Sequence, residues 1–551
     1  MHRRVGAFAG TALAVAALTL SSARPAAAAT TWTSTATQGL TLSNATSLGA
    51  LPASTPLNIS VALSLRNRPA LDQYIRSINT PGDPLYGQSL TPDQFAATYG
   101  PTSDQVRAVT DYLTGDGLTN VQAEPNNLFV TAQGTAAQIE TAFNTSIGQF
   151  QQDGATVYAN TTPAQAPSAL SGTVVAVLGL NNASRLSSPL IKRGASATVP
   201  VNLNGFHPRD YWKAYDAGST RTASGTSTAI FAEGDLTQVV KDLATERAAD
   251  GLPAVPYTIV PVGIHSPDTA GAGEWDLDTQ SSSGIAGTVN HLYIYDATSL
   301  TDNDVALGFN RFVSQDVAKA GSVSFGECDL FPYLDGFMVS GDQIFAEAAA
   351  QGQTVFASSG DTGMSCAVAP TNGVPGSGPV DTEYPASSPY VVGVGGTTLL
   401  TNPQPNTTYV TETAWLGGGG GVSPFETAPF WQTGVAPATT ASVQGGRAVP
   451  DIAMDADPNT GAVIYVNGQP TQIGGTSLAS PLSLGVWARL ETNHSNRIGF
   501  GALPLYHVYG SPGFHDVIAG SNGFYPATPG YDLATGLGTF DIAKMNTVIA
   551  P

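Results

Sequence analysis

The chain has 551 residues, of which 21 are Lys or Arg and 41 are Asp or Glu, so its formal net charge at pH 7 is −20. This excess of acidic groups disfavours nucleic acid and anionic membrane surfaces as partners. Charged residues make up only 11% of the chain, and carboxylates that outnumber bases repel one another less in acid, so the composition suits an acidic medium. The length exceeds what one hydrophobic core accommodates, and at least two domains are expected.

Residues 1–29 have a basic start, an apolar middle and an Ala-rich end. This order is typical of a secretory signal peptide, with cleavage after Ala29, and it predicts a secreted, extracellular product. No later segment reaches the roughly 18 uninterrupted apolar residues of a membrane span. The sequence therefore predicts no membrane association.

Residues 30–195 are predicted to form a small α+β domain followed by a linker, because short strand-like runs alternate there with helical patterns. The polar stretch 184–200 holds the Lys192-Arg193 pair and is interpreted as an exposed linker open to proteolysis. The predicted strands are 57–65, 126–134 and 173–182, and the predicted helices are 69–79, 102–117 and 135–146.

Residues 196–551 alternate near-continuous apolar strands with helices, which predicts a parallel sheet covered on both faces. Ligands of such sheets bind beyond the carboxyl ends of the strands. No Walker or dinucleotide-binding fingerprint is present. The predicted strands are 227–234, 258–264, 291–297, 321–327, 354–361 and 390–396, and helices are predicted at 236–249, 303–320 and 335–352.

A Gly-rich turn near the C-terminus reads Gly474-Gly-Thr-Ser477-Leu-Ala-Ser-Pro481 and continues into an apolar helix. A serine at this place is surrounded by free backbone N–H groups and the positive end of the helix dipole, which suit a nucleophile and an oxyanion. The alternative is that Thr476 or Ser477 only caps the helix.

Acidic residues stand at two further places where a parallel sheet carries chemistry. Glu274 and Asp278 are four residues apart on a predicted helix, so they share one face and can share a proton. Asp361 follows the strand TVFASSG and, if desolvated, would stay neutral and donate a hydrogen bond to an oxyanion. A solvated acidic first turn and an Asp-Gly turn are the alternatives.

None of the seven histidines has the sequence setting of a serine-protease base, so a carboxylate is the expected base. Four stretches accompany the serine turn: 84–101 (PLYGQSLTPDQFAATYGP), 383–397 (EYPASSPYVVGVGGT), 415–423 (WLGGGGGVS) and 447–461, which holds RAVPDI and ADPNTG. Together with Glu274, Asp278, Asp361 and Ser477, they resemble the sedolisin family of serine-carboxyl peptidases, in particular its kumamolisin-like members.

The resemblance implies a subtilisin-like α/β catalytic domain preceded by a ferredoxin-like prodomain that inhibits it. Ser477 would be the nucleophile, Glu274 the base in place of a histidine, Asp278 its orienting partner, and Asp361 the support of the oxyanion. The implied activity is that of an acid-active endopeptidase that cleaves polypeptides, matures from a zymogen by cutting itself, and acts as a monomer.

The C-terminal stretch resembles the calcium site of the same family, which implies one structural Ca²⁺. An Asp/Gly turn without an ion is the alternative that the composition alone favours. The implied ligands are the carboxylates of Asp516 and Asp532 and the backbone carbonyls of Val517, Thr528 and Gly530.

Several points stay open in the sequence. Cys328 and Cys366 form one disulfide or none. Phe325 stands where some relatives carry a Trp that hydrogen-bonds toward the catalytic Glu, and Glu233 lies near another position of that network. Tripeptidyl-peptidase action, a catalytically dead secreted binding protein and a subtilisin-type Ser–His hydrolase are the competing functions. The intact set Glu274, Asp278, Asp361 and Ser477 argues against the dead protein, and the sequence setting of the histidines argues against the Ser–His hydrolase.

Overall fold

The computed structural model describes residues 30–42, 44–187, 205–366, 380–403, 406–436 and 445–549, together with the backbone of residues 191–192. The predicted signal peptide lies outside the described residues, and so does Arg193 of the predicted linker. No helix among the described residues is both long and apolar enough to cross a membrane. From Trp32 onward the chain forms one compact unit.

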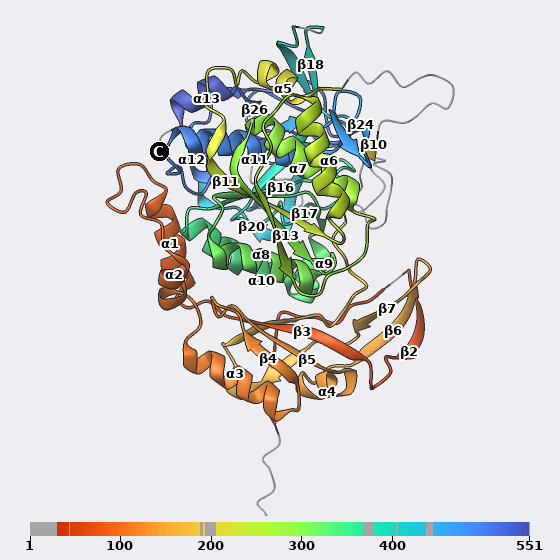
Figure 1. The fold of residues 1–551 in the computed structure, drawn as a ribbon. Helices are drawn as coiled ribbons and strands as arrows, with labels where there is room; N and C mark the ends of the chain where they lie inside the picture. Colours follow the sequence, from red (N-terminus) through yellow and green to blue (C-terminus); the bar gives the residue numbers. More distant parts are fainter. Residues whose placement is uncertain are drawn as a thin grey trace, which may run out of the picture. The chain divides into compact units, whose positions relative to one another are not determined.

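The N-terminal part folds around a four-stranded antiparallel sheet in the order β4-β5-β3-β9. Two helices cover one face of this sheet (Figure 1), and each begins with a Thr–Gln capping box that satisfies its first N–H groups. The strand order and the helix placement are those of a ferredoxin-like domain, as predicted. The elements are β3 (Pro56–Leu63), β4 (Thr119–Ala123), β5 (Phe129–Thr135), β9 (Val174–Leu178), α3 (Ser103–Gly115) and α4 (Ala136–Ala142).

The prediction missed a second small sheet in this domain, in the order β2-β6-β7. Its hairpin turns at Asp153-Gly154, where both residues have positive φ, and Asp-Gly is the usual signal for such a turn. The prediction also missed helix α2. The elements are α1 (Arg68–Ile78), α2 (Pro92–Thr98), β2 (Thr46–Ala50), β6 (Ile147–Gln152) and β7 (Ala155–Asn160).

The larger domain is built on a sheet in the order β12-β13-β11-β14-β16-β18-β19, with β22 also paired to β18. All neighbours are parallel except β18 and β19. Each of the six predicted strands is present. The bounds are β11 (Ala223–Glu233), β12 (Tyr257–Val262), β13 (Val289–Ala297), β14 (Ala320–Val323), β16 (Thr354–Ser358), β18 (Val392–Thr401), β19 (Tyr409–Ala414) and β22 (Ile452–Asp455).

Helices cover both faces of this sheet, as its apolar strands require. Helices α7 and α11 pack against each other, with α6 beside α7, and α8 and α10 cover the opposite face (Figure 1). These helices are α6 (Thr237–Ala249), α7 (Ala272–Ala286), α8 (Asp302–Gln315), α10 (Phe337–Ala350) and α11 (Thr476–Asn493). The remaining elements are β1 (Trp32–Ser34), β8 (Gln165–Pro167), β10 (Ile191–Lys192), α5 (Pro208–Ala214), β15 (Glu327–Cys328), α9 (Leu330–Asp335), β17 (Glu383–Tyr384), β20 (Gly421–Thr427), β21 (Gly446–Val449), β23 (Ala462–Val466), β24 (Gln469–Gly474), α12 (Ala502–His507), β25 (Phe514–His515), β26 (Thr539–Phe540) and α13 (Ile542–Val548).

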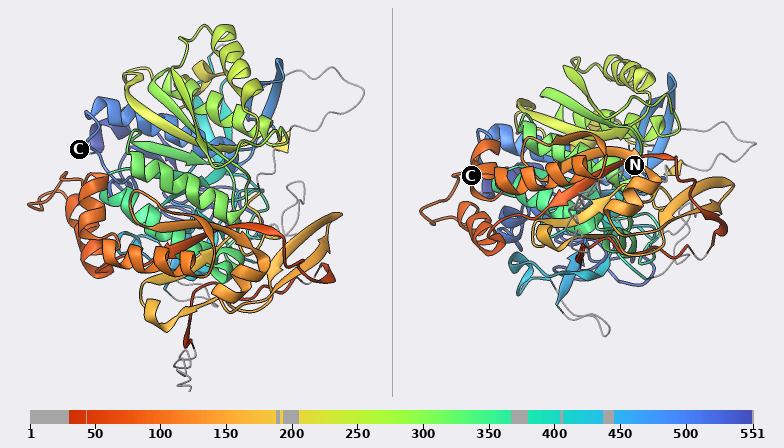
Figure 2. Two further views of the ribbon diagram at one scale, coloured as in Figure 1. Left: turned by 60° about the horizontal axis from the view of Figure 1, so that its bottom comes forward. Right: turned by 90° about the horizontal axis from the view of Figure 1, so that it is seen from below.

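The ferredoxin-like domain contacts the larger domain through its β9 edge and α1, which lie against α10 (Figure 2). Specific polar contacts accompany this packing. The Asn126 amide donates to Glu347 Oε2 at 2.7 Å, and Leu65 N donates to Gln343 Oε1 at 2.7 Å. Tyr390 donates its hydroxyl to Asp72 at 2.6 Å. The two domains are therefore joined by directional hydrogen bonds, of which that of Asn126 is buried, as well as by apolar contact.

Cys328 and Cys366 form a disulfide, with their Cα atoms 5.4 Å apart. Strands β14 and β16 are parallel, so their carboxyl ends lie at one edge of the sheet, and each cysteine follows one of them. The bridge that the sequence left open is thus present beside this edge.

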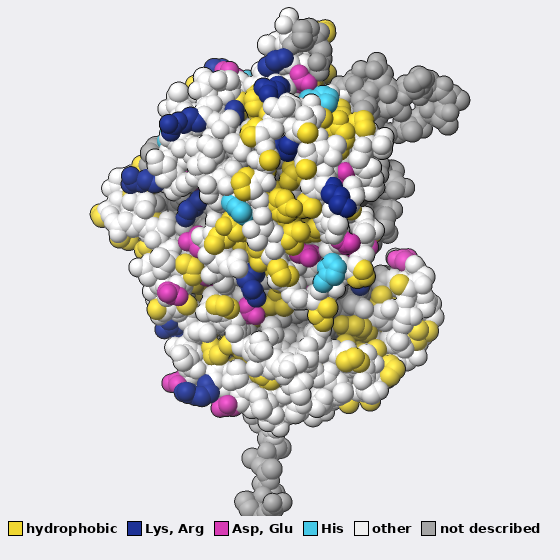
Figure 3. Space-filling view, in the orientation of Figure 1, with side chains coloured by type: hydrophobic (Ala, Val, Ile, Leu, Met, Phe, Trp, Pro, Cys, Tyr) yellow, Lys and Arg dark blue, Asp and Glu magenta, His cyan; other side chains and the backbone are white. Residues whose placement is uncertain are grey.

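Many carboxyl groups of the larger domain are buried without a cation beside them. Burial raises the pKa of Glu347, Asp455 and Asp276 to about 8 each. On the face that Figure 3 shows, Lys and Arg side chains are scattered singly and form no basic patch. Because burial raises these pKa values, the interior of the larger domain favours the protonated form of these carboxyl groups over the charged form.

We expect the folded chain to be more stable at pH 4 than at pH 8. A carboxyl whose folded pKa is raised contributes stability that is complete below its unfolded pKa near 4 and is lost as the pH rises through the folded value. A pKa raised from near 4 to about 8 is worth several kcal/mol across this pH range, so Tm should fall by roughly 5 °C or more. Thermal melts of an inactive Ser477→Ala chain in chelator at both pH values measure this; a higher Tm at pH 8 contradicts it.

Candidate active site

Ser477 lies in the first turn of α11, where the predicted tight loop delivers it. Gly475 precedes the helix with φ of 112°, a conformation open to glycine and strained for other residues. The side chain is 3% exposed, and its hydroxyl donates to the backbone oxygen of Ser324 at 3.3 Å. The hydroxyl thus sits at the carboxyl end of β14, within the sheet edge where ligands bind.

Ser324 connects this serine to the acidic pair. Its hydroxyl donates to Asp278 Oδ1 at 2.5 Å and lies 3.3 Å from the backbone oxygen of Ser477. Ser324 was not among the predicted site residues, because it lies in the middle of the predicted strand 321–327. The observed strand β14 ends at Val323, which places Ser324 at its carboxyl end.

Glu274 and Asp278 both lie on α7, in its first two turns, and α7 packs directly against α11. Their side chains are 2% and 0% exposed. Burial raises the pKa of Asp278 well above its usual value, the Glu274 carboxylate raises it further, and the hydrogen bond from Ser324 opposes both. Because the charge of one group raises the pKa of the other, the two carboxyl groups titrate as a coupled pair.

Asp361 follows β16 and reaches the residue beside the serine. Its Oδ1 accepts from Thr476 N at 2.6 Å and from Thr476 Oγ1 at 2.9 Å. Its Oδ2 is buried and has no hydrogen-bond partner among the described residues. A Cβ at Gly475 would stand 2.7 Å from that oxygen, so the glycine leaves room for it. Burial raises the pKa of Asp361 to about 6.

A cavity of about 510 Å³ opens beside the acidic pair. Glu274 and Trp275 of α7 line it together with Glu233 at the end of β11, and residues 298–300 after β13 form another wall. Burial raises the pKa of Glu233 to about 7, and Asp268 and Asp296 add to the effect. The cavity is large enough for several side chains of a peptide.

The chain that leaves the ferredoxin-like domain runs into this cavity, and Arg185 and Leu186 form part of its lining. Leu186 N donates to the backbone oxygen of Leu300 at 3.0 Å. Ser187 and Gly326 exchange two antiparallel backbone hydrogen bonds, at 2.9 and 3.1 Å. Farther along, Ile191 pairs antiparallel with Gly474, three residues before Ser477. The polar sequence predicts an exposed linker here, whereas Ser187 and Ile191 pair with the larger domain.

Phe325 packs edge-on against Trp275, with ring centroids 6.0 Å apart. The indole N–H of Trp275 donates to the backbone oxygen of Glu233 at 2.8 Å. An indole on α7 therefore reaches Glu233, although the position of the expected Trp is occupied by Phe325.

Backbone-to-carboxylate hydrogen bonds join parts of the predicted calcium segment, residues 516–532, near the C-terminus. Asp516 Oδ2 accepts from Gly530 N at 3.0 Å, and Asp532 Oδ2 accepts from Thr528 N at 2.8 Å. Within the described chain, no hydrogen bond uses the carbonyl oxygens of Val517, Thr528 or Gly530. Asp532 Oδ1 also accepts from Ala534 N at 2.9 Å and Thr535 N at 2.8 Å. Carboxylates and backbone carbonyls are hard oxygen ligands of the kind that Ca²⁺ takes.

Comparisons with known proteins agree with this geometry. Residues 43–183 match the pro-kumamolisin activation domain, and residues 240–499 match the subtilase family. Xanthomonalisin of Xanthomonas sp. (strain T-22) is 39% identical over 90% of this chain and 66% of its own length, so the chain spans just under two thirds of that relative. Sedolisin of Pseudomonas sp. (strain 101) is 40% identical over 91% of this chain and 88% of its own length.

A solved structure gives the same result for the larger domain. Pseudomonas sedolisin, a serine-carboxyl proteinase complexed with two molecules of pseudo-iodotyrostatin, matches with a TM-score of 0.58 and 40% identity. The match covers 62% of this chain and 97% of that one. The fold, the activation domain and the level of identity over most of both chains lead to one conclusion: the chain belongs to the sedolisin family of serine-carboxyl peptidases.

Proposed function

We propose that this chain is a secreted, acid-active endopeptidase that is made as a self-processing zymogen. The observation that carries the proposal is the hydrogen-bonded series from Ser477 through Ser324 to Asp278, with Asp361 held beside the same serine by Thr476. No histidine among the described residues is hydrogen-bonded to the Ser477 hydroxyl, which favours a carboxyl base over a Ser–His pair.

In the proposed mechanism, Ser477 Oγ attacks the carbonyl carbon of the scissile bond while its proton passes to the Glu274 carboxylate. Asp278 shares that proton and holds Glu274 in place. The carbonyl oxygen becomes an oxyanion, and protonated Asp361 donates a hydrogen bond to it through Oδ2. Glu274 then protonates the leaving amine, and water hydrolyses the acyl-enzyme on Ser477. The hydroxyl must first rotate away from the Ser324 carbonyl, its partner in this structure.

Digestion of a denatured protein at pH 4, followed by sequencing of the products, tests the proposal. Internal cleavage at many sites is expected of an endopeptidase. Successive release of tripeptides from the N-terminus would assign the second candidate, a tripeptidyl-peptidase. A chain that neither cuts itself after acidification nor yields products from the denatured protein would be a catalytically dead binding protein.

Autoprocessing should cut the chain between Ser187 and Ile191. The segments on either side of residues 188–190 both pair with the larger domain, one at Gly326 and the other at Gly474, and the two pairings flank the serine turn. A peptide paired on both sides of a nucleophile is held as a substrate is held. N-terminal sequencing after acidification should give a mature chain that begins within residues 188–191.

An inactive Ser477→Ala chain is the control for this cleavage and should stay intact under the same acidification. A first cut after Lys192-Arg193, or within the following GASATVP stretch, would show that the paired segment is not the first substrate.

Calcium in the 516–532 turn is part of the proposal and has a structural role. The residues that would hold it are Asp516, Val517, Thr528, Gly530 and Asp532. The ion would tie the segment after β25 to the segment before β26 and neutralise the two carboxylates. Burial raises the pKa of Asp532, while hydrogen bonds from Thr528 N and its neighbours oppose the shift.

Chelation should lower Tm, because an ion that binds only the folded chain stabilises it by mass action. Asp516→Asn should make this drop smaller, since it removes one negative ligand from an exposed side chain. Differential scanning calorimetry with and without chelator measures the drop. Asp541→Asn is a matched control: Asp541 caps α13 through Lys544 N at 3.1 Å, outside the proposed site. Equal drops in the parent and Asp516→Asn would contradict the assignment.

A further inference from the structure

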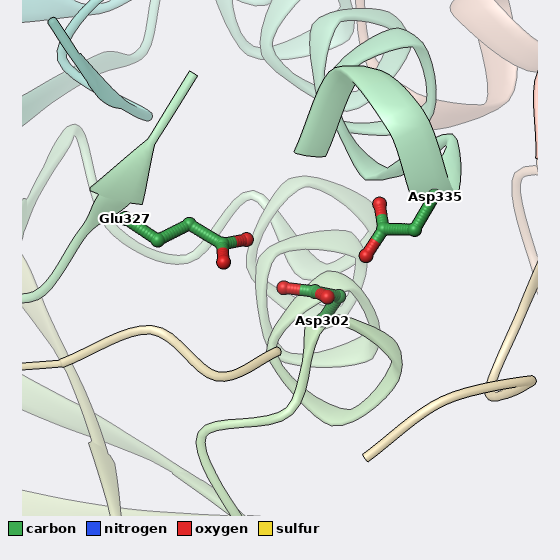
Figure 4. Close-up of side chains that lie close together, drawn as sticks. All are labelled: Asp302, Glu327 and Asp335. Carbon is green, nitrogen blue, oxygen red and sulfur yellow. The ribbon is translucent and has the colours of Figure 1, made fainter. Parts of the chain in front are cut away.

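Three acidic side chains outside the proposed catalytic set converge at a second place (Figure 4). Asp302 begins α8, Glu327 lies in β15, and Asp335 ends α9. They are 4%, 6% and 3% exposed, and one oxygen of each lies within 4.8 Å of an oxygen of the other two. None of the ion pairs in the described chain involves any of them.

The hydrogen bonds around this group leave three oxygens uncommitted. Glu327 Oε2 accepts from the Ser184 hydroxyl at 2.5 Å, and Asp335 Oδ2 accepts from the Asn181 amide at 3.3 Å. Asp335 Oδ1 accepts from Phe337 N at 2.9 Å. Both oxygens of Asp302 and Oε1 of Glu327 are buried, and among the described residues only the carboxyl groups of this acidic group itself can pair with them. Figure 4 shows the Asp302 carboxylate lying between the other two.

Buried carboxylate oxygens without a donor are costly, because each loses its hydration and gains nothing in return. A cation at the centre of the group would supply the missing partner to all of them. The centre of three atoms that lie within 4.8 Å of one another is at most about 2.8 Å from each, close to the roughly 2.3–2.6 Å of Ca²⁺–oxygen bonds. Mg²⁺ requires shorter contacts of about 2.1 Å and retains several waters, for which a site this buried has little room.

We propose that Asp302, Glu327 and Asp335 form a second cation site that takes a hard divalent cation, with Ca²⁺ as the fitting ion. None of its residues belongs to the 516–532 turn, and its contacts connect it to the end of the prodomain. Ser184 and Asn181, which contact its ligands, belong to the segment that lines the cavity at Arg185 and Leu186 and pairs with Gly326 at Ser187. Glu327 directly follows Gly326, the partner of Ser187. An ion here would fasten the end of the prodomain to the strand that holds the linker.

Calcium counting on the full-length chain tests the site without relying on peptidase activity. The background is Ser477→Ala, which keeps the prodomain attached, and the measurement is equilibrium dialysis with ⁴⁵Ca²⁺ at pH 7. Asp302→Asn should bind one Ca²⁺ fewer than the parent, and Asp516→Asn should leave this site loaded. Glu347→Gln is the matched control, because Glu347 is equally buried against the prodomain but accepts from Asn126 and Gln351. It should bind as many ions as the parent.

Thermal melts with and without Ca²⁺ distinguish a cation site from a group of carboxyls that only share protons. In chelator, Asp302→Asn should melt above its parent, because it removes a buried charge that has no partner. In millimolar Ca²⁺ it should melt below the parent, because it cannot hold the ion. If the three carboxyl groups instead share protons, the substitution shifts Tm by the same amount and in the same direction in both solutions, and the ion count is unchanged. An unchanged ion count together with equal Tm shifts overturns the proposal. A Ser477→Ala chain that also carries Asp516→Asn and binds no Ca²⁺ overturns it as well.

Discussion

Ser477→Ala is expected to abolish peptide hydrolysis and to leave the fold intact. The substitution removes only the hydroxyl, whose hydrogen bond in this structure is a 3.3 Å contact to the Ser324 carbonyl. Losing a nucleophile that acts with its base as one unit should cost at least about 10⁴-fold in kcat. Hydrolysis of a fluorogenic peptide at pH 4 measures the loss, and far-UV circular dichroism with Tm confirms the fold.

Ser483→Ala is the matched control in the same helix. The Ser483 hydroxyl is buried and donates only within α11, to the Ala479 carbonyl at 2.9 Å. Its removal should change activity by no more than a few fold. Comparable losses in the two variants would mean that serine substitutions in α11 act through the helix and would remove the support for Ser477 as the nucleophile. Retained activity in Ser477→Ala would do so directly.

The strands of the larger domain could be predicted because their residues are apolar on both faces. A run such as TVFASSG (354–360) is typical of a central parallel strand, and it lies in β16 between β14 and β18. The two small-domain features that were missed have weaker patterns. Strand β2 is exposed along its whole length, and α2 has only seven residues, so neither carries a clear hydrophobic period.

In the site, the sequence could pair only those residues that are close together along the chain. Glu274 and Asp278 are neighbours on one helix, so four-residue spacing was enough to pair them. The contact of Asp361 with Thr476 joins residues 115 positions apart, and only the position of Asp361 at a strand's end hinted at it. The linker pairing at Ser187 and the Asp302 group depend on which surfaces meet in the folded chain. The sequence of 184–200 is polar, and polarity alone favoured an exposed loop.

The linker pairing and the acidic group around Asp302, which the sequence did not predict, both involve the short segment 326–328. Gly326 pairs with the linker, Glu327 accepts from the prodomain, and Cys328 forms the disulfide. Three consecutive residues thus connect the substrate-like segment, the acidic group and the covalent bridge. The segment that receives the linker is thus held in place by the hydrogen bond of Glu327 with Ser184 and by the Cys328–Cys366 disulfide. This explains how a prodomain can hold its own linker against the larger domain.

Glu274→Gln is expected to remove nearly all activity, because an amide cannot accept the proton of the serine. Loss of a general base should cost about 10²–10⁴-fold in kcat at pH 4. Asp276→Asn is the matched control on the same helix. Asp276 is also buried, with its pKa raised to about 8 by burial and by Asp242, but it belongs to neither the serine nor the Asp278 series. It should retain activity within a few fold. Full activity in Glu274→Gln would exclude the carboxyl mechanism.

The pH profile of the parent enzyme separates the acidic roles. Because burial raises the pKa of Asp361 to about 6, its carboxyl can donate to an oxyanion below that pH and loses the proton above it. Activity should therefore fall as the pH rises through about 6, and it should fall again in strong acid as the Glu274–Asp278 pair takes up its second proton. Asp361→Asn should lower activity at pH 4 but abolish the decline near pH 6, since an amide donates at every pH. A decline that stays near pH 6 in Asp361→Asn, or an optimum near pH 8 that one histidine substitution removes, would show that another group governs the reaction.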